Sequence, residues 1–360
     1  MHAVLVQTHF PRKLTHTRYD QYLASGWFRG SVMLYKMDLL CIDAKVYSVV
    51  NIRLDMDKHA LSKSQRKVKR KVEKAFTVAI GPAKISQSRQ RLYAAHKGRF
   101  KGFIHETLDE YLHAGFHSTV FDTQEVCVYD GDRLIAVSYF DLGDRSMASL
   151  LALYDAEYDQ YSLGVYTMLK EIEYGQQTGR KWYYPGYVLD LPSAFDYKLK
   201  LGEMEYYTPS KRWGKYANFK RELSVAHRLR MAMHQLSGAL KEEHIPAKTW
   251  YYPYFSMGYM PLWKDRFLHL PWVLELGHDL DGMCIVGFCA ERDAYVLTHV
   301  HPCPDEQHFI NLEQAREFGD DQTYISHLME YGVPIAEGSL SEIIEHIQLW
   351  STRIDKIPPV

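Results

Sequence analysis

The residues best suited to chemistry form a basic run, SKSQRKVKRKVEKAF, at 62–76. Ser62 or Ser64 can cap its start, and apolar residues recur in it at helical spacing, which predicts a helix with one apolar face and one basic face. Positions 58–101 hold fourteen Lys or Arg residues and a single acid, Glu73. Charge of this density in a chain of net charge −1 indicates an anionic partner for this segment. The side chains expected to contact the phosphates of such a partner, or the carboxylates of an acidic substrate, are Lys63, Lys67, Lys69, Arg70, Lys71 and Lys74.

Arg66 is the member of this run best suited to bind a carboxylate, because a guanidinium can bind both carboxylate oxygens at once. Ser64 and Gln65 lie beside it and are expected to bind the same substrate, and Arg53 in the preceding extended segment can share the role. The alternatives are a solvated helix face for Arg66 and a surface ion pair for Arg53.

A second candidate is the polar turn at Ser162 and Gly164, between an apolar strand at 147–158 and an amphipathic helix at 162–180. The free N–H groups and the positive dipole end of a helix can hold a phosphate or a developing oxyanion. Asp155 precedes the turn and can accept a proton or bind a cationic group. A capped helix in an ordinary strand–helix unit explains this local pattern at least as well.

These residues need a sheet and helices to position them. Two strands at 125–131 and 132–143 meet at Asp130-Gly131-Asp132, a strong hairpin signal. With the next strand, helix and strand they predict a mixed α+β sheet with a crossover helix. The other expected elements are a helix, turn and strand over 16–35, strands at 48–54, 181–189, 283–290 and 294–300, and helices at 103–116, 217–243, 312–318 and 339–350.

Composition limits the class of protein. A length of 360 residues favours two globular units, and 46% hydrophobic with 24% charged residues is ordinary for a folded soluble chain. No apolar run approaches the ~18 residues of a membrane span, and the N-terminal apolar stretch is too short for a secretory signal. Five scattered cysteines without a CxxC pair predict reduced thiols in a cytoplasmic protein.

Two long blocks of the sequence resemble the arginyl-tRNA–protein transferases. YDQYLASGWFRG at 19–30 is similar to that family's Tyr-rich, Gly-Trp-Arg motif, and 51–76 to its extended Arg segment followed by Ser-Lys-Ser-Gln-Arg-Lys. The block at 161–202 is similar to its Leu-Ser-Leu-Gly-Thr-Tyr helix, its Tyr-Tyr-x-Gly-Tyr strand and the Tyr-Lys that follows. The resemblance covers about half of the chain and ends near residue 210.

The resemblance implies an acetyltransferase-like fold and a reaction. We expect an N-terminal basic part at 1–100, the acetyltransferase-like mixed sheet at 101–243 and a C-terminal α/β extension at 244–360. The implied reaction moves an aminoacyl group, with arginine expected first, from tRNA to the N-terminal α-amine of a protein that begins with Asp or Glu. The family's bacterial branch transfers Leu. The implied partners are therefore an aminoacyl-tRNA and a protein N-terminus. No membrane partner is expected, and the oligomeric state is left open.

Aminoacyl-tRNA is already an activated ester. The enzyme then needs positioning, deprotonation of an α-amine of pKa about 8, and oxyanion support. By the resemblance Tyr187, Tyr197 and Lys198 lie near the acyl centre, where Tyr can orient the amine and Lys can pair with a terminal phosphate or a carboxylate. Asp155 is the fourth catalytic candidate. An aromatic core is the alternative for the tyrosines, of which the chain has 27.

The sequence departs from the family in two places. Where the family has a cysteine cluster this chain has only Cys41, and one thiolate cannot form a tetrahedral site, so no metal and no cofactor besides aminoacyl-tRNA are expected. Positions 192–195 read Pro-Ser-Ala-Phe instead of Cys-Pro-Lys-Met, which leaves donor and acceptor specificity open. His299 and His301 alternate on a strand, and a structural pair is favoured over a metal site.

Two other functions stay open on the sequence. One is an acetyltransferase-like enzyme that uses an acyl-thioester donor, or a tRNA-dependent enzyme that acts on a small molecule. The other is a tRNA-binding relative without catalytic activity, for which the changed loop at 192–195 would mark the loss.

Overall fold

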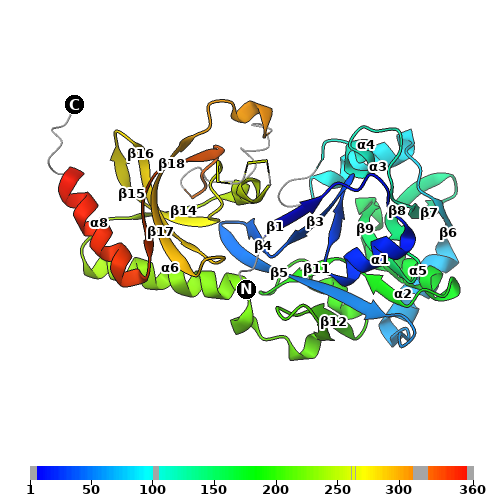
Figure 1. Cartoon of the computed structure of the whole chain (residues 1–360). Helices are drawn as coiled ribbons and strands as arrows, with labels where there is room; N and C mark the ends of the chain where they lie inside the picture. The colour runs from blue at the N-terminus through cyan, green and yellow to red at the C-terminus, as the bar shows by residue number, and fades with distance from the viewer. Residues whose placement is uncertain (1–5, 100–104, 261, 264, 311–322, 355–360) are drawn as a thin grey trace. The chain divides into compact units, whose positions relative to one another are not determined.

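The computed structural model describes residues 6–99, 105–260, 262–263, 265–310 and 323–354 (Figure 1). The chain forms two compact units. We call Thr8–Lys36 with Val49–Lys220 the central unit. The C-terminal unit comprises Met1–Gln7, Met37–Ser48 and Arg221–Val360. The division into 1–100, 101–243 and 244–360 stays a prediction.

The central unit is built on one mixed sheet in the order β13-β12-β5-β10-β9-β8-β7-β6. The strands are β5 (Lys45–Asp55), β6 (Thr77–Pro82), β7 (Thr123–Asp130), β8 (Arg133–Leu142), β9 (Ser146–Tyr154), β10 (Trp182–Tyr184), β12 (Met204–Tyr207) and β13 (Trp213–Lys215). Neighbours are antiparallel except β9 and β10, which run parallel and are joined by the helix α5 (Leu163–Gln177). The predicted mixed sheet with a crossover helix is confirmed.

The predicted hairpin joins β7 and β8, with Asp130 paired to Arg133 across the turn. Gly131 has a φ of 57°, in the left-handed region that glycine adopts without strain. From Leu134 to Leu142 every residue of β8 is buried, as expected for a strand covered on both faces.

The basic run forms α2 (Lys63–Ala75), as predicted. Ser62 accepts a hydrogen bond from the Gln65 backbone N–H, and the Gln65 side chain accepts one from the Ser62 N–H, which is a capping box. Val72 packs with Leu163 and Tyr166 of α5 in a small apolar cluster. In Figure 1, α2 and α5 lie side by side against the sheet.

The elements around the sheet differ in part from the prediction. The helix expected at 103–116 is α4 (Leu108–His113), which begins after a Thr107 capping box and ends at Ala114, where φ is 51°; positions 103 and 104 lie outside the described residues. The helix α3 (Gln87–Lys97) was not predicted, because its polar sequence has little apolar periodicity. The segment at 16–35 forms α1 (His16–Ala24) and the hairpin of β2 (Phe28–Gly30) and β3 (Met33–Met37).

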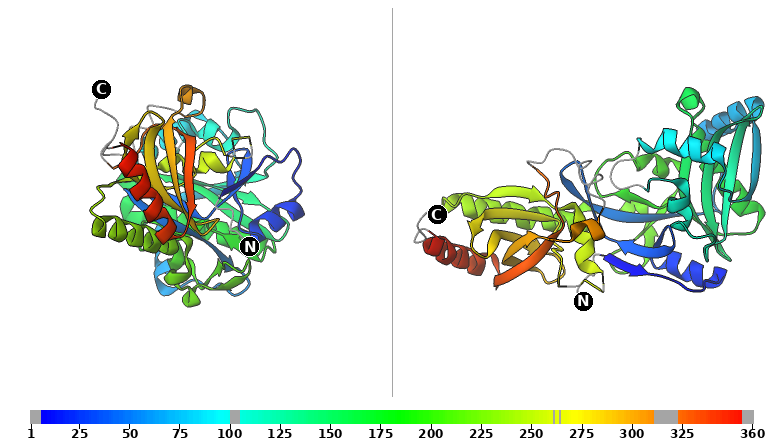
Figure 2. Two further views of the ribbon diagram at one scale, coloured as in Figure 1. Left: turned by 60° about the vertical axis from the view of Figure 1, so that its left-hand side comes forward. Right: turned by 90° about the horizontal axis from the view of Figure 1, so that it is seen from above.

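The C-terminal unit has an antiparallel sheet in the order β14-β15-β16-β17-β18. Its strands are β14 (Lys248–Tyr251), β15 (Trp272–Asp279), β16 (Gly282–Cys289), β17 (Ala294–Pro302) and β18 (Met329–Gly338). The helices α6 (Val225–Glu242) and α8 (Leu340–Ile354) pack on it, and Figure 2 shows α8, in red, along the sheet. The predicted strands and the last helix are confirmed. The helix expected at 217–243 begins later, where Ser224 caps it, and that at 312–318 lies outside the described residues.

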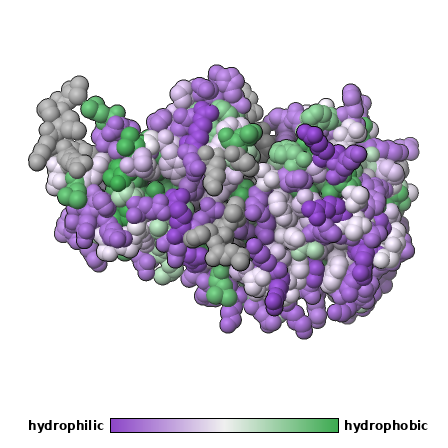
Figure 3. All heavy atoms as spheres, in the orientation of Figure 1, coloured by the Kyte–Doolittle hydropathy of each residue, from purple (hydrophilic) through white to green (hydrophobic). Residues whose placement is uncertain are grey.

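Among the described residues, no helix is long and apolar enough to cross a membrane. Hydrophilic residues predominate on the face drawn in Figure 3, and hydrophobic ones gather there in small groups. All five cysteines are free thiols, and all but Cys41 are buried, as expected for small apolar side chains.

Candidate functional site

The two parallel strands of the central sheet part at one point. β10 pairs with β9 as far as Tyr184 and Ala148 and ends there, before Pro185. After Gly186, whose φ is 92°, the chain continues as β11 (Tyr187–Leu189), which pairs with β5 instead. β9 runs on to Tyr154, paired only with β8 among the described strands. We call this opening between β9 and β11 the strand gap.

The gap edge of β9 carries a bulge. Tyr139 of β8 pairs with Leu151 and Phe140 with Ser149, so Leu150 is the extra residue. The Tyr111 hydroxyl donates to the carbonyl of Leu150 at 3.1 Å, as expected for a carbonyl that the sheet ladder leaves free. A bulge at an unpaired strand edge presents backbone polar groups to whatever enters the gap.

Two of the predicted catalytic residues meet beside the gap. The Lys198 ammonium donates to the backbone carbonyl of Tyr187 at 3.1 Å and lies 5.2 Å from the centre of that residue's ring. Burial lowers the pKa of Lys198 to about 8. A Cβ on Gly186 would lie 3.4 Å from the Lys198 Nζ atom, so the glycine leaves room for the ammonium. Lys198 thus places a positive charge where the strands part.

Tyr197, the third of these residues, is 40% exposed and lies near other groups than Tyr187 and Lys198 do. Its ring is near Glu171 and Tyr154, whose charges, together with burial as the larger cause, raise its pKa to about 12. Both Tyr197 and Lys198 lie on the short helix η2 (Asp196–Leu201). The structure therefore brings Tyr187, Tyr197 and Lys198 to one region of the central unit.

Asp155, the fourth predicted catalytic residue, is engaged elsewhere. Its carboxylate accepts a hydrogen bond from Arg133 at 2.5 Å and one from the Glu157 backbone N–H at 3.1 Å. It caps the short helix η1 (Ala156–Tyr161). These contacts give Asp155 a structural explanation, and its catalytic role stays a prediction.

The turn at Ser162 and Gly164 lies at the N-terminus of α5, as predicted. Ser162 adopts a φ of 54°, unusual for a residue other than glycine, and its side chain makes no capping hydrogen bond. A Cβ on Gly164 would meet only the Tyr154 ring, at 3.5 Å. Because no side chain among the described residues accepts from them, the first N–H groups of α5 are available to an anion or an oxyanion.

The basic face of α2 is divided into engaged and free side chains. Lys69 contacts Glu173 at 2.7 Å, Lys71 donates to the Gln160 carbonyl, and Arg66 donates to the Leu61 carbonyl at 2.5 Å. The cations that make no contact of this kind with described residues, and that we call the α2 stripe, are Lys63, Lys67, Arg70 and Lys74. They are spaced 4, 3 and 4 residues apart, so they follow one another along a single face.

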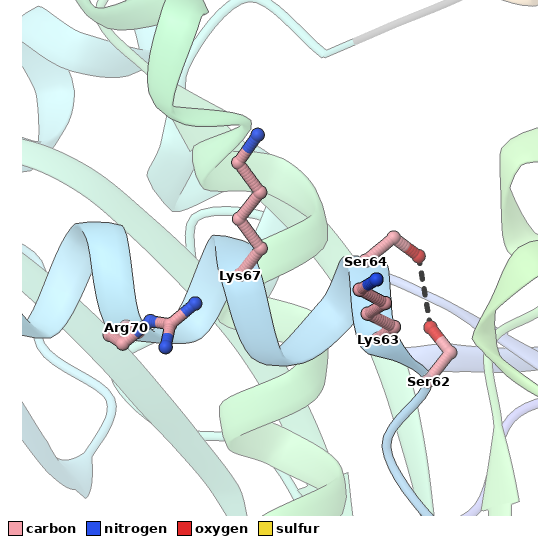
Figure 4. Close-up of a pocket in the computed structure, with 5 residues that line it drawn as sticks. All are labelled: Ser62, Lys63, Ser64, Lys67 and Arg70. Carbon is pink, nitrogen blue, oxygen red and sulfur yellow. Dashed lines mark hydrogen bonds between the residues drawn. The ribbon is translucent and has the colours of Figure 1, made fainter.

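A hollow of about 570 Å³ opens at the first turns of α2, lined by Ser62, Lys63, Ser64, Lys67 and Arg70. Figure 4 shows Lys63 beside the two serine hydroxyls, which are 2.9 Å apart and hydrogen-bonded, while Lys67 and Arg70 project from the next turns of the helix. Positive charge, hydroxyl groups and a helix N-terminus together suit a phosphate or a carboxylate.

Gln65 was expected to bind substrate, but it is only 6% exposed. Its amide donates to the carbonyls of Lys200 and Leu201 at 2.9 and 3.0 Å, and so ties the start of α2 to the end of η2. Gln65 therefore helps to position Lys198, and its contacts with the backbone explain why it is buried.

Replacing Gln65 by Ala is expected to destabilise the central unit by about 2 kcal/mol, because the variant lacks the side-chain half of the capping box and both bridging hydrogen bonds. Urea unfolding followed by circular dichroism measures this. Ser64→Ala is the control, since Ser64 is exposed and, among the described residues, its side chain bonds only to Ser62. Equal stability of the two variants would contradict the positioning role of Gln65.

Arg53 is held by its neighbours. Its guanidinium forms an ion pair with Glu205 through Nε at 2.8 Å and Nη2 at 2.7 Å. It also lies 3.6 Å from the ring centre of Trp182 and 4.4 Å from that of Trp213. The structure therefore contains the ion pair that was the alternative interpretation of Arg53. A substrate carboxylate could bind this guanidinium only by displacing Glu205.

The predicted substrate-binding residues do not all lie together. Ser64 and Arg66 lie at the start of α2, close to η2. Ser162 and Gly164 lie near the C-terminal end of α2, where Phe76 packs on Tyr161. A helix of 13 residues is about 20 Å long. One extended ligand could reach both ends, but a single small group could not.

Glu171 of α5 was missed from the sequence. It is fully buried, and its carboxylate accepts a hydrogen bond from the Tyr183 hydroxyl at 2.7 Å. The spacing of the helix could have identified it, because Thr167, Glu171 and Gly175 are four residues apart and lie on its buried face. A carboxylic acid in that row marks an internal polar contact.

The C-terminal histidines face different groups. His299 Nε2 lies 2.8 Å from Asp279, which also accepts a hydrogen bond from Trp350, and His301 lies 3.6 Å from Glu330. Asp279, Asp281 and His299 could offer three ligand atoms within 4.8 Å of one another. The Trp350–Asp279–His299 contacts agree with a structural role for His299, and the expectation of no metal stays a prediction.

Known proteins match the chain in the region of the strand gap. The family model described as "Arginine-tRNA-protein transferase, C terminus" matches residues 84–208. The predicted resemblance is confirmed. An aspartate/glutamate leucyltransferase of Leptospira interrogans serovar copenhageni is 23% identical over 207 residues, or 56% of this chain and 76% of that protein. One from Vibrio vulnificus strain YJ016 is 27% identical over 190 residues, or 52% of this chain and 78% of that protein.

Solved structures give weaker likenesses. L-PGS from Bacillus licheniformis is 11% identical with a TM-score of 0.32, and the match covers 42% of this chain and 52% of that one. FemX is 9% identical with a TM-score of 0.34, covering 53% and 65%. The sequence relatives confirm that the chain is related to enzymes of the aminoacyltransferase class.

Proposed function

We propose that this protein transfers an aminoacyl group from tRNA to the N-terminal α-amine of a protein that begins with Asp or Glu. The observation that supports this proposal most is that the family match covers the strand gap. Residues 84–208 include both strands of the gap, the β9 bulge and the Tyr187–Lys198 contact. Relatives named for leucine transfer and for aspartate and glutamate support the donor and acceptor classes.

The donor amino acid is the finer part of the proposal. The sequence resemblance favours arginine, and the names of the relatives add leucine. The chemistry is the same for both, because each arrives as an ester on tRNA. Attack by the α-amine forms the amide bond, and the tRNA leaves with its hydroxyl restored.

We assign the acyl centre to the strand gap. The uncapped start of α5 near Ser162 supplies backbone N–H groups for oxyanion support. Lys198 supplies a cation that can pair with the terminal phosphate of the donor or with the acidic acceptor side chain. Tyr187 and Tyr197 orient the amine. An acetyltransferase-like ancestry of this sheet and a cytoplasmic location belong to the same proposal.

The deciding experiment offers the protein a panel of tRNAs charged with labelled amino acids and peptides that begin with Asp, Glu or Ala. Mass detection of a peptide extended by one residue, for Asp or Glu only, is the expected result. Absence of transfer from every charged tRNA would overturn the proposal. Binding of acetyl-CoA without tRNA binding would instead indicate a thioester-dependent acyltransferase, and tRNA binding without turnover a non-catalytic relative.

We propose that the α2 stripe binds tRNA phosphates. Replacing Lys63, Lys67, Arg70 and Lys74 together by Ala is expected to weaken tRNA binding at least tenfold near physiological salt, because the variant lacks up to four cations that pair with phosphates. The slope of log affinity against log salt should become shallower by about 0.7–0.9 for each phosphate that no longer has a cationic partner. Fluorescence anisotropy over a salt series measures both quantities.

The matched control for the stripe is Lys69→Ala, because Lys69 is already neutralised by Glu173. We expect it to change affinity by less than about threefold. An unchanged salt slope in the fourfold variant would remove α2 from the tRNA site.

A further inference from the structure

The carboxylic acid of Glu171 lies inside the central unit at the level of the strand gap. Its Oε2 atom accepts from Tyr183, the middle residue of β10. The hydroxyls of Ser138 on β8 and Ser149 on β9 face the same carboxyl group. Ser149 comes directly after Ala148, the last β9 residue that pairs with β10. Three strands thus bring hydroxyls to one buried acid.

In the part of the chain that the structure describes, this acid has no neutralising cation. Glu171 has no exposed surface, and Lys, Arg and His form no ion pair with it among the described residues. Its Oε1 atom has no hydrogen bond of good geometry, and neither has the Ser138 hydroxyl. Burial raises the pKa of Glu171 to about 7. An acid buried in this way is near the midpoint of its titration at physiological pH.

Of the groups that face Glu171, two are fully buried and two are partly exposed to solvent. Tyr183 is fully buried, and burial together with the nearby acid raises its pKa far above the physiological range. Ser138 is also fully buried. Ser149 is partly exposed on the gap edge of β9, and it faces both Glu171 and Tyr183. Tyr197 approaches the acid from η2 and is the second partly exposed neighbour.

We propose that Glu171 is the proton acceptor for the attacking α-amine, with the Ser149 hydroxyl as the link between the strand gap and the buried carboxylate. This inference rests on the proposed function. It assigns the deprotonation step to a residue outside the set expected from the sequence.

Protons and bonds balance in this step. The α-ammonium of the acceptor gives one proton through Ser149 to the Glu171 carboxylate and becomes a free amine. The amine attacks the ester carbonyl, the C–N bond forms and the C–O bond to tRNA breaks. The second amine proton goes to the departing ribose oxygen, and Glu171 returns its proton to water. A base of pKa near 7 suits an amine of pKa about 8, because proton transfer between them is nearly balanced.

Glu171→Gln is the decisive variant, since the amide keeps the shape and can still accept from Tyr183 but cannot take a proton. Transfer is measured between pH 6 and 9 in short single-turnover reactions, because the donor ester hydrolyses in alkali. At pH 7 we expect the rate to fall by about 100-fold. At pH 9 the difference should shrink to within about fivefold, because an amine of pKa about 8 is then mostly neutral.

Glu173→Gln is the matched control on the same helix. Glu173 faces Lys69 and Lys170 and not the gap, so the variant should keep the wild-type pH profile. If Glu171→Gln folds poorly, Ser149→Ala tests the same route without changing the helix, and Ser149→Thr should restore the rate.

The outcomes separate this inference from the proposed function. An active wild type together with a Glu171→Gln variant of equal rate overturns the inference alone. So does a loss of the same size at every pH, which is what a purely structural hydrogen-bond role predicts. A wild type that transfers nothing from any charged tRNA overturns both.

Discussion

Replacing Lys198 by Met is expected to lower kcat/KM for aminoacyl transfer by about 100-fold, because a half-buried cation that pairs with substrate is worth about 2–5 kcal/mol. Stability should not fall with activity. The folded state lowers the pKa of Lys198 from 10.5 to about 8 through burial, so the charge is held at a cost that Met removes. A loss of rate with equal or greater stability distinguishes a functional lysine from a structural one.

The measurement pairs steady-state transfer with thermal unfolding of the same samples. Lys200→Met is the control, because Lys200 lies on the same short helix but is exposed to solvent. We expect it to retain wild-type rate and stability. A Lys198→Met variant that loses stability in proportion to activity would contradict the assignment. So would one that keeps full activity.

The pKa of Lys198 also predicts the alkaline side of the rate profile. Above pH about 8 the ammonium loses its proton, so an interaction that needs the charge weakens as pH rises. Glu171 governs the acidic side, because its carboxylate must be ionised to take a proton. The wild type should therefore show a bell-shaped dependence. Lys198→Met should remove the alkaline limb, and Glu171→Gln should move the acidic limb to the pKa of the amine itself, about 8.

The sequence correctly predicted those elements whose formation depends on residues close together in the chain. The helix α2 was predicted from apolar spacing and a serine cap, and the structure has that cap at Ser62. The β7–β8 hairpin followed from Asp130-Gly131-Asp132, where Gly131 has a positive φ. In both cases the deciding residues lie within a few positions of one another.

The strand gap could not be predicted in the same way. The sequence suggested one strand over 181–189, and the break at Pro185-Gly186 matters only because β5, far away in the chain, pairs with both halves. Arg53 shows the same limit. Its partner Glu205 is 152 residues away, so no local signal separated a free guanidinium from a paired one.

The sequence predicted the positions of some site residues correctly and those of others not. Lys198 and Tyr187 meet because η2 folds back on β11, and the order of motifs placed them correctly in one region. Gln65 looked like a polar surface residue on a basic helix, yet its amide bonds to the backbone of η2. Glu171 looked like one more charge among many in an amphipathic helix.

Glu171→Gln is also expected to become the more stable protein as pH rises. The folded state raises the pKa of Glu171 from 4.5 to about 7 through burial. Below the unfolded pKa the acid is neutral in both states and costs nothing. Between the two values the unfolded state binds fewer protons, so wild-type stability falls with pH. A shift of that size corresponds to about 3 kcal/mol above pH 8, and glutamine carries no such cost.

Urea unfolding of both proteins between pH 5 and 8.5 measures this difference. Glu173→Gln should change in the opposite direction. Partial burial acts to raise the pKa of Glu173, but the hydrogen bonds from Lys69 and Lys170 outweigh it and lower that pKa. Its carboxylate therefore stabilises the fold above its unfolded pKa, and the variant should lose stability as pH rises. If the difference between Glu171→Gln and the wild type does not change with pH, Glu171 is not held as a buried acid, and it could not take up the amine proton.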